Sequence, residues 1–280
     1  MSNYHFTGAV SSAFNNGSNW SNDAGTPYAS GSAPASGDII YIDGIPVNSI
    51  AGFNASGTPF AGFYVADDYT GTIGSSGAYL QLNVPSGKSQ IDASLAGVMF
   101  LSGVGTSGLG DLTITDSIAA ITLAGKITNF YPAKGTITIK AATVISNVAQ
   151  IDYITGIYDV MLTVEAGATL PTVITTRGGL ITLNANSTTL NINGGKVVGY
   201  GDVTAVNVYA GATFDYRDGT VGTFTVYGTL DGSKSVEVRA ITNPINLYDS
   251  GKIITDELNT MDLTSIIFYG HNPNITLPYG

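Results

Sequence analysis

A short strand, a small turn, a threonine and an apolar residue recur along the middle of this chain. The unit occurs at 138–145 (TIKAATVI), 163–170 (TVEAGATL), 182–190 (TLNANSTTL), 207–214 (NVYAGATF) and 225–230 (TVYGTL). The threonines at 143, 169, 189, 213 and 229 follow one another at a loose period of about 20 residues. A period of this length is typical of a solenoid, in which each coil is one repeat and neighbouring coils stack. The repeat therefore favours an all-β parallel β-helix.

Short segments with the alternation of β-strands begin abruptly at Asp38 and continue towards the C-terminus, as in 38–44 (DIIYIDG) and 79–84 (YLQLNV). Gly-rich turns separate them, and the chain has 36 Gly. Short strands with regular turns also occur in antiparallel β-sandwiches, so this fold stays open as the alternative.

The charged residues exclude several classes of protein. The chain carries 10 Lys+Arg against 20 Asp+Glu, and only three of the acidic residues are Glu. Helix surfaces favour Glu, Lys and Arg, and these residues are scarce in this chain. The composition therefore argues against a helical fold. With few cations, the chain has no basic face for nucleic acid or for an anionic membrane surface. The absence of Cys excludes disulfides and Cys-based zinc sites.

Three segments follow from these patterns: residues 1–37 as an N-terminal arm or cap, 38–260 as the solenoid, and 261–280 as a C-terminal cap or interface segment. Residues 1–37 are mostly small and polar, a composition typical of a loop or arm. Four spaced aromatic residues of this segment are candidate anchors on another surface: Phe6, Phe14, Trp20 and Tyr28. A cap folded over the end of its own domain is the alternative. For an arm, we expect deletion of residues 1–30 to leave the solenoid folded.

No group of residues predicts catalysis, a cofactor site or a metal site. The GxGxxG sequence at 103–108 is followed by strand-like alternation, whereas dinucleotide binding needs a helix there. Adjacent Asp67 and Asp68 would point to opposite faces if extended. Asp215 and Asp218 flank Arg217, which predicts a turn with a local ion pair. The two histidines, His5 and His271, have no sequence neighbour that would form a catalytic group, which favours surface or interface roles.

The N-terminal sequence MSNYHFTGAVSSAF has no basic n-region and no apolar run long enough for a Sec-type signal peptide or a membrane span. We therefore expect synthesis in a cytoplasm. The 16 Tyr beside one Trp suggest contact surface, because tyrosine combines a large apolar area with a polar tip.

The sequence also resembles a known architecture. Asn19-Trp20-Ser21, followed by Pro34 and by Gly37-Asp38-Ile39-Ile40-Tyr41-Ile42, is similar to the opening of right-handed parallel β-helix proteins. These include phage tailspikes, adhesin passenger domains and some phage head proteins. The resemblance covers about residues 15–45 and 136–232. It implies a right-handed, single-stranded β-solenoid, and the lack of a signal peptide favours the phage proteins over the adhesins.

These observations predict a non-enzymatic virion structural protein, first of all a capsid decoration or cement protein on the virion surface. Its expected partners are the major capsid protein and further copies of itself, as a homotrimer, without nucleic acid, membrane or cofactor. A tail-associated receptor-binding or polysaccharide-degrading spike is the first alternative. A cell-surface adhesin or surface-layer component is the second.

Overall fold

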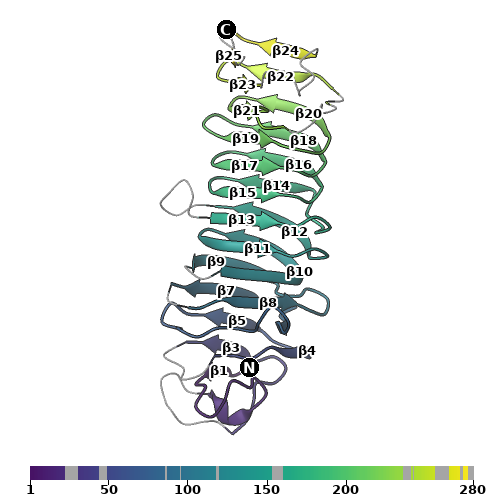
Figure 1. Ribbon diagram of the computed structural model, residues 1–280. Helices are drawn as coiled ribbons and strands as arrows, with labels where there is room; N and C mark the ends of the chain where they lie inside the picture. The colour runs from purple at the N-terminus through teal and green to yellow at the C-terminus, as the bar shows by residue number, and fades with distance from the viewer. Residues whose placement is uncertain are drawn as a thin grey trace. The chain divides into compact units, whose positions relative to one another are not determined.

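The computed structural model describes residues 1–22, 31–43, 49–85, 87–94, 96–117, 120–152, 160–235, 241, 243–255, 265–271 and 274–276. The chain divides into two compact units, Met1–Ser146 and Asn147–Gly280. In each unit successive strands contribute in turn to two sheets, here named sheet A and sheet B (Figure 1). One pass through both sheets makes one coil.

Unit 1 begins with a small cap and continues into parallel strands. Its cap contains β1 (Asn3–Phe6), the 3-10 helix η1 (Gly17–Asn19) and β2 (Trp20–Ser21). Sheet A then contains β3 (Ile39–Ile42), β5 (Gly62–Val65), β7 (Lys88–Ala93), β9 (Asp111–Ser117) and the second half of β10 (Ala120–Pro132). Sheet B contains β4 (Phe53–Pro59), β6 (Leu80–Asn83), β8 (Met99–Gly103), the first half of β10 and β11 (Gly135–Ile139).

Unit 2 repeats the same plan with shorter coils. Its sheet A contains the end of β12 (Val144–Ile151), then β14 (Val173–Thr176), β16 (Ser187–Ile192), β18 (Val203–Val208), β20 (Val221–Val226), β22 (Ile245–Tyr248) and β24 (Ile266–Tyr269). Its sheet B contains β13 (Val160–Val164), β15 (Leu180–Leu183), β17 (Lys196–Gly199), β19 (Thr213–Tyr216), β21 (Thr229–Asp231), β23 (Lys252–Ile254) and β25 (Asn274–Thr276).

The strand pairing distinguishes the two folds that the sequence left open. Among the described residues, every strand pair with an assigned register is parallel except β1–β2. The parallel β-helix is therefore confirmed and the antiparallel sandwich is wrong. In unit 2, register partners on adjacent coils of sheet A lie 16 to 25 positions apart, which is the coil length. A right-handed coil is what the rule for parallel crossover connections predicts.

The core of each unit is a set of in-register apolar columns. In sheet A of unit 2, Ile174, Leu190, Val206, Phe224 and Ile245 follow one another from coil to coil, and all are buried. Their sequence neighbours face outward, as the period-2 alternation of a strand requires. Each coil thus buries the apolar side chains of the coil below it.

The turn of the repeat unit requires a left-handed backbone. Gly167 and Gly211 have φ of 90° and 82°, a conformation that glycine adopts without strain. Ala142 occupies the equivalent place in 138–145 with φ of 61°, and it is the one non-glycine residue of the described chain with positive φ. The recurring Ala-Gly pair therefore reflects the geometry of a corner between the two sheets.

The structure of the cap shows what Asn19 and Trp20 contribute to the fold. The Asn19 side chain accepts hydrogen bonds from the backbone N–H groups of Val10 and Ser11 and donates one to the carbonyl of Ala13. Trp20 is fully buried and donates from Nε1 to the carbonyl of Phe14 at 2.6 Å. The asparagine thus organises the loop that the tryptophan fixes to the core.

At the other end of the sequence, β24 and β25 continue the sheets of unit 2, and the role of 261–280 as cap or interface stays a prediction. Ile267, Phe268 and Tyr269 are exposed there. Within the described ranges, no helix has the length and apolarity needed to cross a bilayer.

Candidate functional site

Three of the four aromatic side chains predicted as attachment anchors lie inside unit 1. Phe6, Phe14 and Trp20 are 1%, 3% and 0% exposed. The rings of Phe6 and Phe14 pack edge-on against Trp20, with centroid distances of 5.2 and 5.0 Å. Attachment of another molecule through these side chains would therefore require the cap to open. The fourth residue, Tyr28, lies outside the described residues.

The acidic group around Arg217 is a covered ion-pair cluster. Asp215 lies in β19, so the turn prediction is wrong for this residue, whereas Asp218 accepts a hydrogen bond from the Gly219 N–H in the turn. The predicted ion pair between Asp215 and Arg217 is confirmed, and Lys196 Nζ lies 2.7 Å from the same carboxylate.

The two cations of this cluster favour the ionised form of Asp215 and cover its carboxylate. Burial by itself raises the pKa of Asp215, but hydrogen bonds and charges from Arg217 and Lys196 outweigh it, so that the pKa lies below its ordinary value. The Asp215 side chain is 0% exposed. A carboxylate that is both paired twice and covered cannot contact a substrate, which assigns this group to stability.

His5 has a partner that sequence neighbours could not reveal. Its Nδ1 lies 2.7 Å from Oδ2 of Asp43, 38 residues away, and its ring stacks on Tyr41 at 4.8 Å. The side chain is 12% exposed, so little of it is open to solvent, and the surface or interface role expected for it stays a prediction. The pair joins β1 to the end of β3 and helps to hold the cap. His271 lies in an exposed segment, where its backbone N–H donates to Asp249.

Three carboxylates gather at one edge of sheet A in unit 1, and we call Asp67, Asp92 and Asp116 the aspartate cluster. Asp92 in β7 and Asp116 in β9 are register partners on adjacent coils, and Lys134 Nζ lies 2.8 Å from Asp116. Burial raises the pKa of Asp92, and the negative charges of Asp67 and Asp116 raise it further.

Sequence reasoning missed most of this cluster. It considered Asp67 only together with its neighbour Asp68, and Asp92 and Asp116 were not singled out. These two residues are 24 positions apart and meet because that distance is one coil. The sequence signal that could have identified Asp92 and Asp116 is their spacing of one coil length.

The outer face of sheet A in unit 2 carries two uncharged columns, which we call the ladder face. One column consists of Asn191, Asn207, Thr225 and Asn246, and the other of Tyr209, Tyr227, Tyr248 and Tyr269.

Contacts between coils hold side chains in both columns. Asn207 Nδ2 donates to Asn191 Oδ1 at 2.8 Å. The tyrosine rings stack with successive centroid distances of 6.0, 4.2 and 4.7 Å. Because stacked rings cover one another's faces, this column presents ring edges and hydroxyl groups. The ladder face is therefore polar, aromatic and built from uncharged side chains, several of which are held by contacts between coils.

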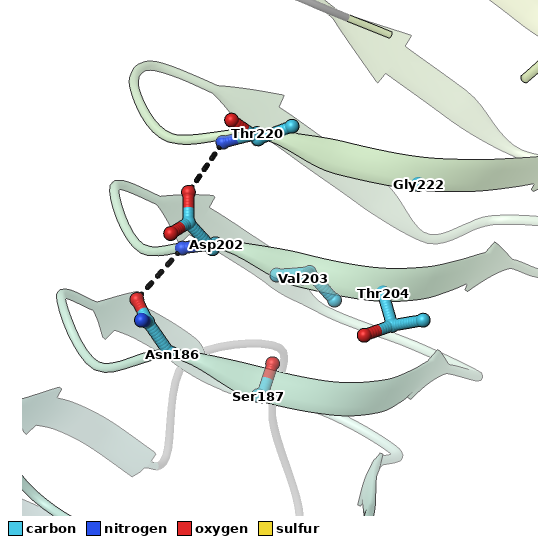
Figure 2. Close-up of a pocket in the computed structure, with 7 residues that line it drawn as sticks. All are labelled: Asn186, Ser187, Asp202, Val203, Thr204, Thr220 and Gly222. Atoms are coloured by element: carbon cyan, nitrogen blue, oxygen red, sulfur yellow. Dashed lines mark hydrogen bonds between the residues drawn. The ribbon is translucent and has the colours of Figure 1, made fainter. Parts of the chain in front are cut away.

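A groove of about 440 Å³ lies at the corners that precede β16, β18 and β20 in unit 2 (Figure 2). Asn186, Asp202 and Thr220 lie one above another there. The Asp202 N–H donates to Asn186 Oδ1 at 2.9 Å, and the Thr220 N–H donates to Asp202 Oδ1 at 2.7 Å. Its other lining residues are Ser187, Val203, Thr204 and Gly222. A single carboxylate, one amide and several hydroxyl groups thus face a shared space.

Within the described part of the chain, no three His, Cys, Asp or Glu side chains are arranged to hold a metal ion. Likewise, the GxGxxG turn leads from β8 into β9 and not into a helix, so it lacks the helix N-terminus that would hold a pyrophosphate.

Comparison with protein-family models, with curated protein sequences and with solved structures gave no match to this chain.

Proposed function

We propose that this chain is a non-enzymatic structural protein of a phage particle, a decoration or cement protein that contacts the capsid shell and neighbouring copies of itself. The observation that carries this proposal is the ladder face. Protein interfaces are depleted of charge at their centre and enriched in tyrosine, and both features meet on this face.

The order within the ladder face suits a binding surface. Its side chains are held by hydrogen bonds and ring stacking between coils, as for Asn191 with Asn207 and Tyr227 with Tyr248. Binding normally costs about 0.5–1.5 kcal/mol for each flexible side chain that it immobilises. For the side chains held between coils, much of this entropy cost is met when the chain folds and not when a partner binds.

A charged residue at the centre of the ladder face tests the proposal. Asn207→Arg places an unpaired charge within the Asn/Thr column, while Thr182→Arg is the matched control at an outward position of sheet B in the same unit. We expect Asn207→Arg to lower occupancy on capsids by at least about tenfold, because a buried unpaired charge costs several kcal/mol. Thr182→Arg should leave occupancy unchanged.

Mass spectrometry of purified particles gives the readout as copy number relative to the major capsid protein. Circular dichroism of both variants shows whether they fold. Absence of the wild-type chain from particles, or equal occupancy of the two folded variants, would contradict the proposal.

The aspartate cluster favours a second candidate, a polysaccharide-degrading spike. Glycoside hydrolysis uses a carboxyl group kept protonated beside a second that stays ionised. Asp92, whose pKa is raised by burial, and Asp116, which is paired with Lys134, are register partners on adjacent coils, so two carboxyl groups in different surroundings lie beside each other.

The two candidates differ in whether Asp92 is needed for glycan turnover. For the spike, purified protein releases reducing ends from a capsular polysaccharide of the host, and Asp92→Asn abolishes that release while Asp68→Asn, an exposed neighbour of the cluster, does not. For the decoration protein, no release occurs with any of the three proteins.

A further inference from the structure

The groove before β16, β18 and β20 contains a hydroxyl group that the described part of the chain leaves unpaired. Ser187 Oγ is buried and has no hydrogen-bond partner among the described residues. Buried polar atoms are nearly always paired, so an orphaned one calls for an explanation such as a water molecule or a ligand. Ser187 lines the groove, so rotation of its side chain between staggered rotamers would bring this covered hydroxyl group to a partner there (Figure 2).

Other polar atoms of the groove are also available. Asp202 accepts the Thr220 N–H through Oδ1, while its Oδ2 makes no hydrogen bond to the described residues. The hydroxyl groups of Thr204 and Thr220 make none either, and both residues line the groove. The backbone hydrogen bonds at this corner hold these groups on three consecutive coils, so the site is formed before any ligand arrives.

The chemistry of these groups selects one ligand class. Asp202 disfavours anions, and a single carboxylate makes a poor calcium site, since calcium takes about six to eight oxygen ligands. The lining has no aromatic residue and only one apolar side chain, Val203, so an apolar molecule gains little. A polyhydroxylated neutral molecule can donate hydroxyl protons to Asp202 and exchange hydrogen bonds with Ser187 and Thr204.

We infer that this groove binds a neutral glycan unit, held by Asp202, Ser187 and Thr204. Its volume of about 440 Å³ falls within the range of small-molecule sites, roughly 300–1,000 Å³. A site built to hydrogen-bond hydroxyl groups discriminates strongly against ligands that lack them, because its polar atoms would then stay unpaired. This inference does not depend on the role proposed for the ladder face, since the two surfaces share no residue.

Binding of short neutral glycans to the full chain tests the inference. Maltotriose, cellotriose, mannotriose and chitotriose are titrated separately and followed by saturation-transfer NMR and calorimetry. We expect at least one of them to bind with a Kd below about 10 mM.

Two variants locate that binding. Ser187→Ala removes only the unpaired hydroxyl, and Asp202→Asn keeps the oxygen that accepts the Thr220 N–H. We expect each to weaken binding by about tenfold or more, whereas Thr182→Val on sheet B should not change it. Thermal unfolding separates binding from stability, because Ser187→Ala removes a buried unpaired group and should not lower the unfolding temperature. Failure of all four glycans to bind at about 10 mM, or equal binding by wild type and both variants, would overturn the inference.

Discussion

Asp215 is a carboxylate on the outer face of a sheet that is nevertheless fully covered. Two long cationic side chains, Lys196 from the preceding coil and Arg217 from the same strand end, lie over it. Each cation is itself partly exposed, so the cluster loses hydration mainly at the carboxylate. A buried ion pair stabilises a fold little against an apolar replacement, but removal of one partner is costly.

We therefore expect Asp215→Asn to lower the free energy of unfolding at pH 7 by about 1.5–3 kcal/mol, the range for hydrogen bonds to charged groups. Because the pKa of Asp215 is lowered by folding, its stabilising contribution is fully present above the unfolded value of about 3.9 and is lost as pH falls through the folded value. The difference between wild type and Asp215→Asn should narrow below about pH 4.

Urea unfolding at pH 7 and pH 3 measures this difference, with Asp218→Asn as the control that keeps the hydrogen bond to Gly219. A difference that stays constant or widens in acid would show that the carboxylate charge is not the stabilising feature.

At the scale of elements, alternation located the strands well but did not reveal their order in space. Strands such as Ile39–Ile42 and Leu180–Leu183 were visible because every second residue is apolar and buried. The threonines of the repeat unit, however, come from two different corners of the coil. Thr189 lies in β16 of sheet A and Thr213 in β19 of sheet B, so their spacing is not a whole coil. Local pattern cannot separate two similar corners, because the assignment depends on pairing with strands of other coils.

The cap shows the same limit. Composition could not decide between an arm and a cap, since burial of Phe6 and Trp20 depends on β1 pairing with β3, which begins at Ile39. The aspartate cluster was missed for a related reason, as its members meet only across coils.

This packing changes the expected effect of altering the cap. Phe6→Ala should lower the stability of the cap by about 3–5 kcal/mol, the usual cost of truncating a buried aromatic residue. For the same reason, we now expect deletion of residues 1–30 to destabilise unit 1. Trp20 is the single tryptophan of the chain, so its fluorescence in urea reports opening of the cap directly.

Val10→Ala is the matched control, because Val10 is 63% exposed in the same segment. Its fluorescence midpoint should equal that of the wild type. An unchanged midpoint in Phe6→Ala would mean that the aromatic cluster contributes nothing to cap stability.

At the scale of the whole molecule, the formal net charge of −10 opposes association of identical chains. Copies that meet must do so where no charge is concentrated, and the ladder face is such a surface. Repulsion between the rest of the two surfaces acts over the Debye length, about 10 Å at 0.1 M salt and 3 Å at 1 M. Salt should therefore strengthen association through an uncharged face, whereas it weakens an interface of opposite charges.

We expect the purified chain to sediment as a trimer whose fraction increases when NaCl is raised from about 20 mM to about 500 mM. Asn207→Arg should sediment as a folded monomer at both concentrations, and Thr182→Arg as the wild type does. Sedimentation equilibrium measures all three proteins at the same concentrations. A trimer that dissociates as salt is added would point to charge pairing and away from the ladder face. A wild-type monomer under both conditions would contradict self-association, and would leave the capsid shell as the one partner for this face.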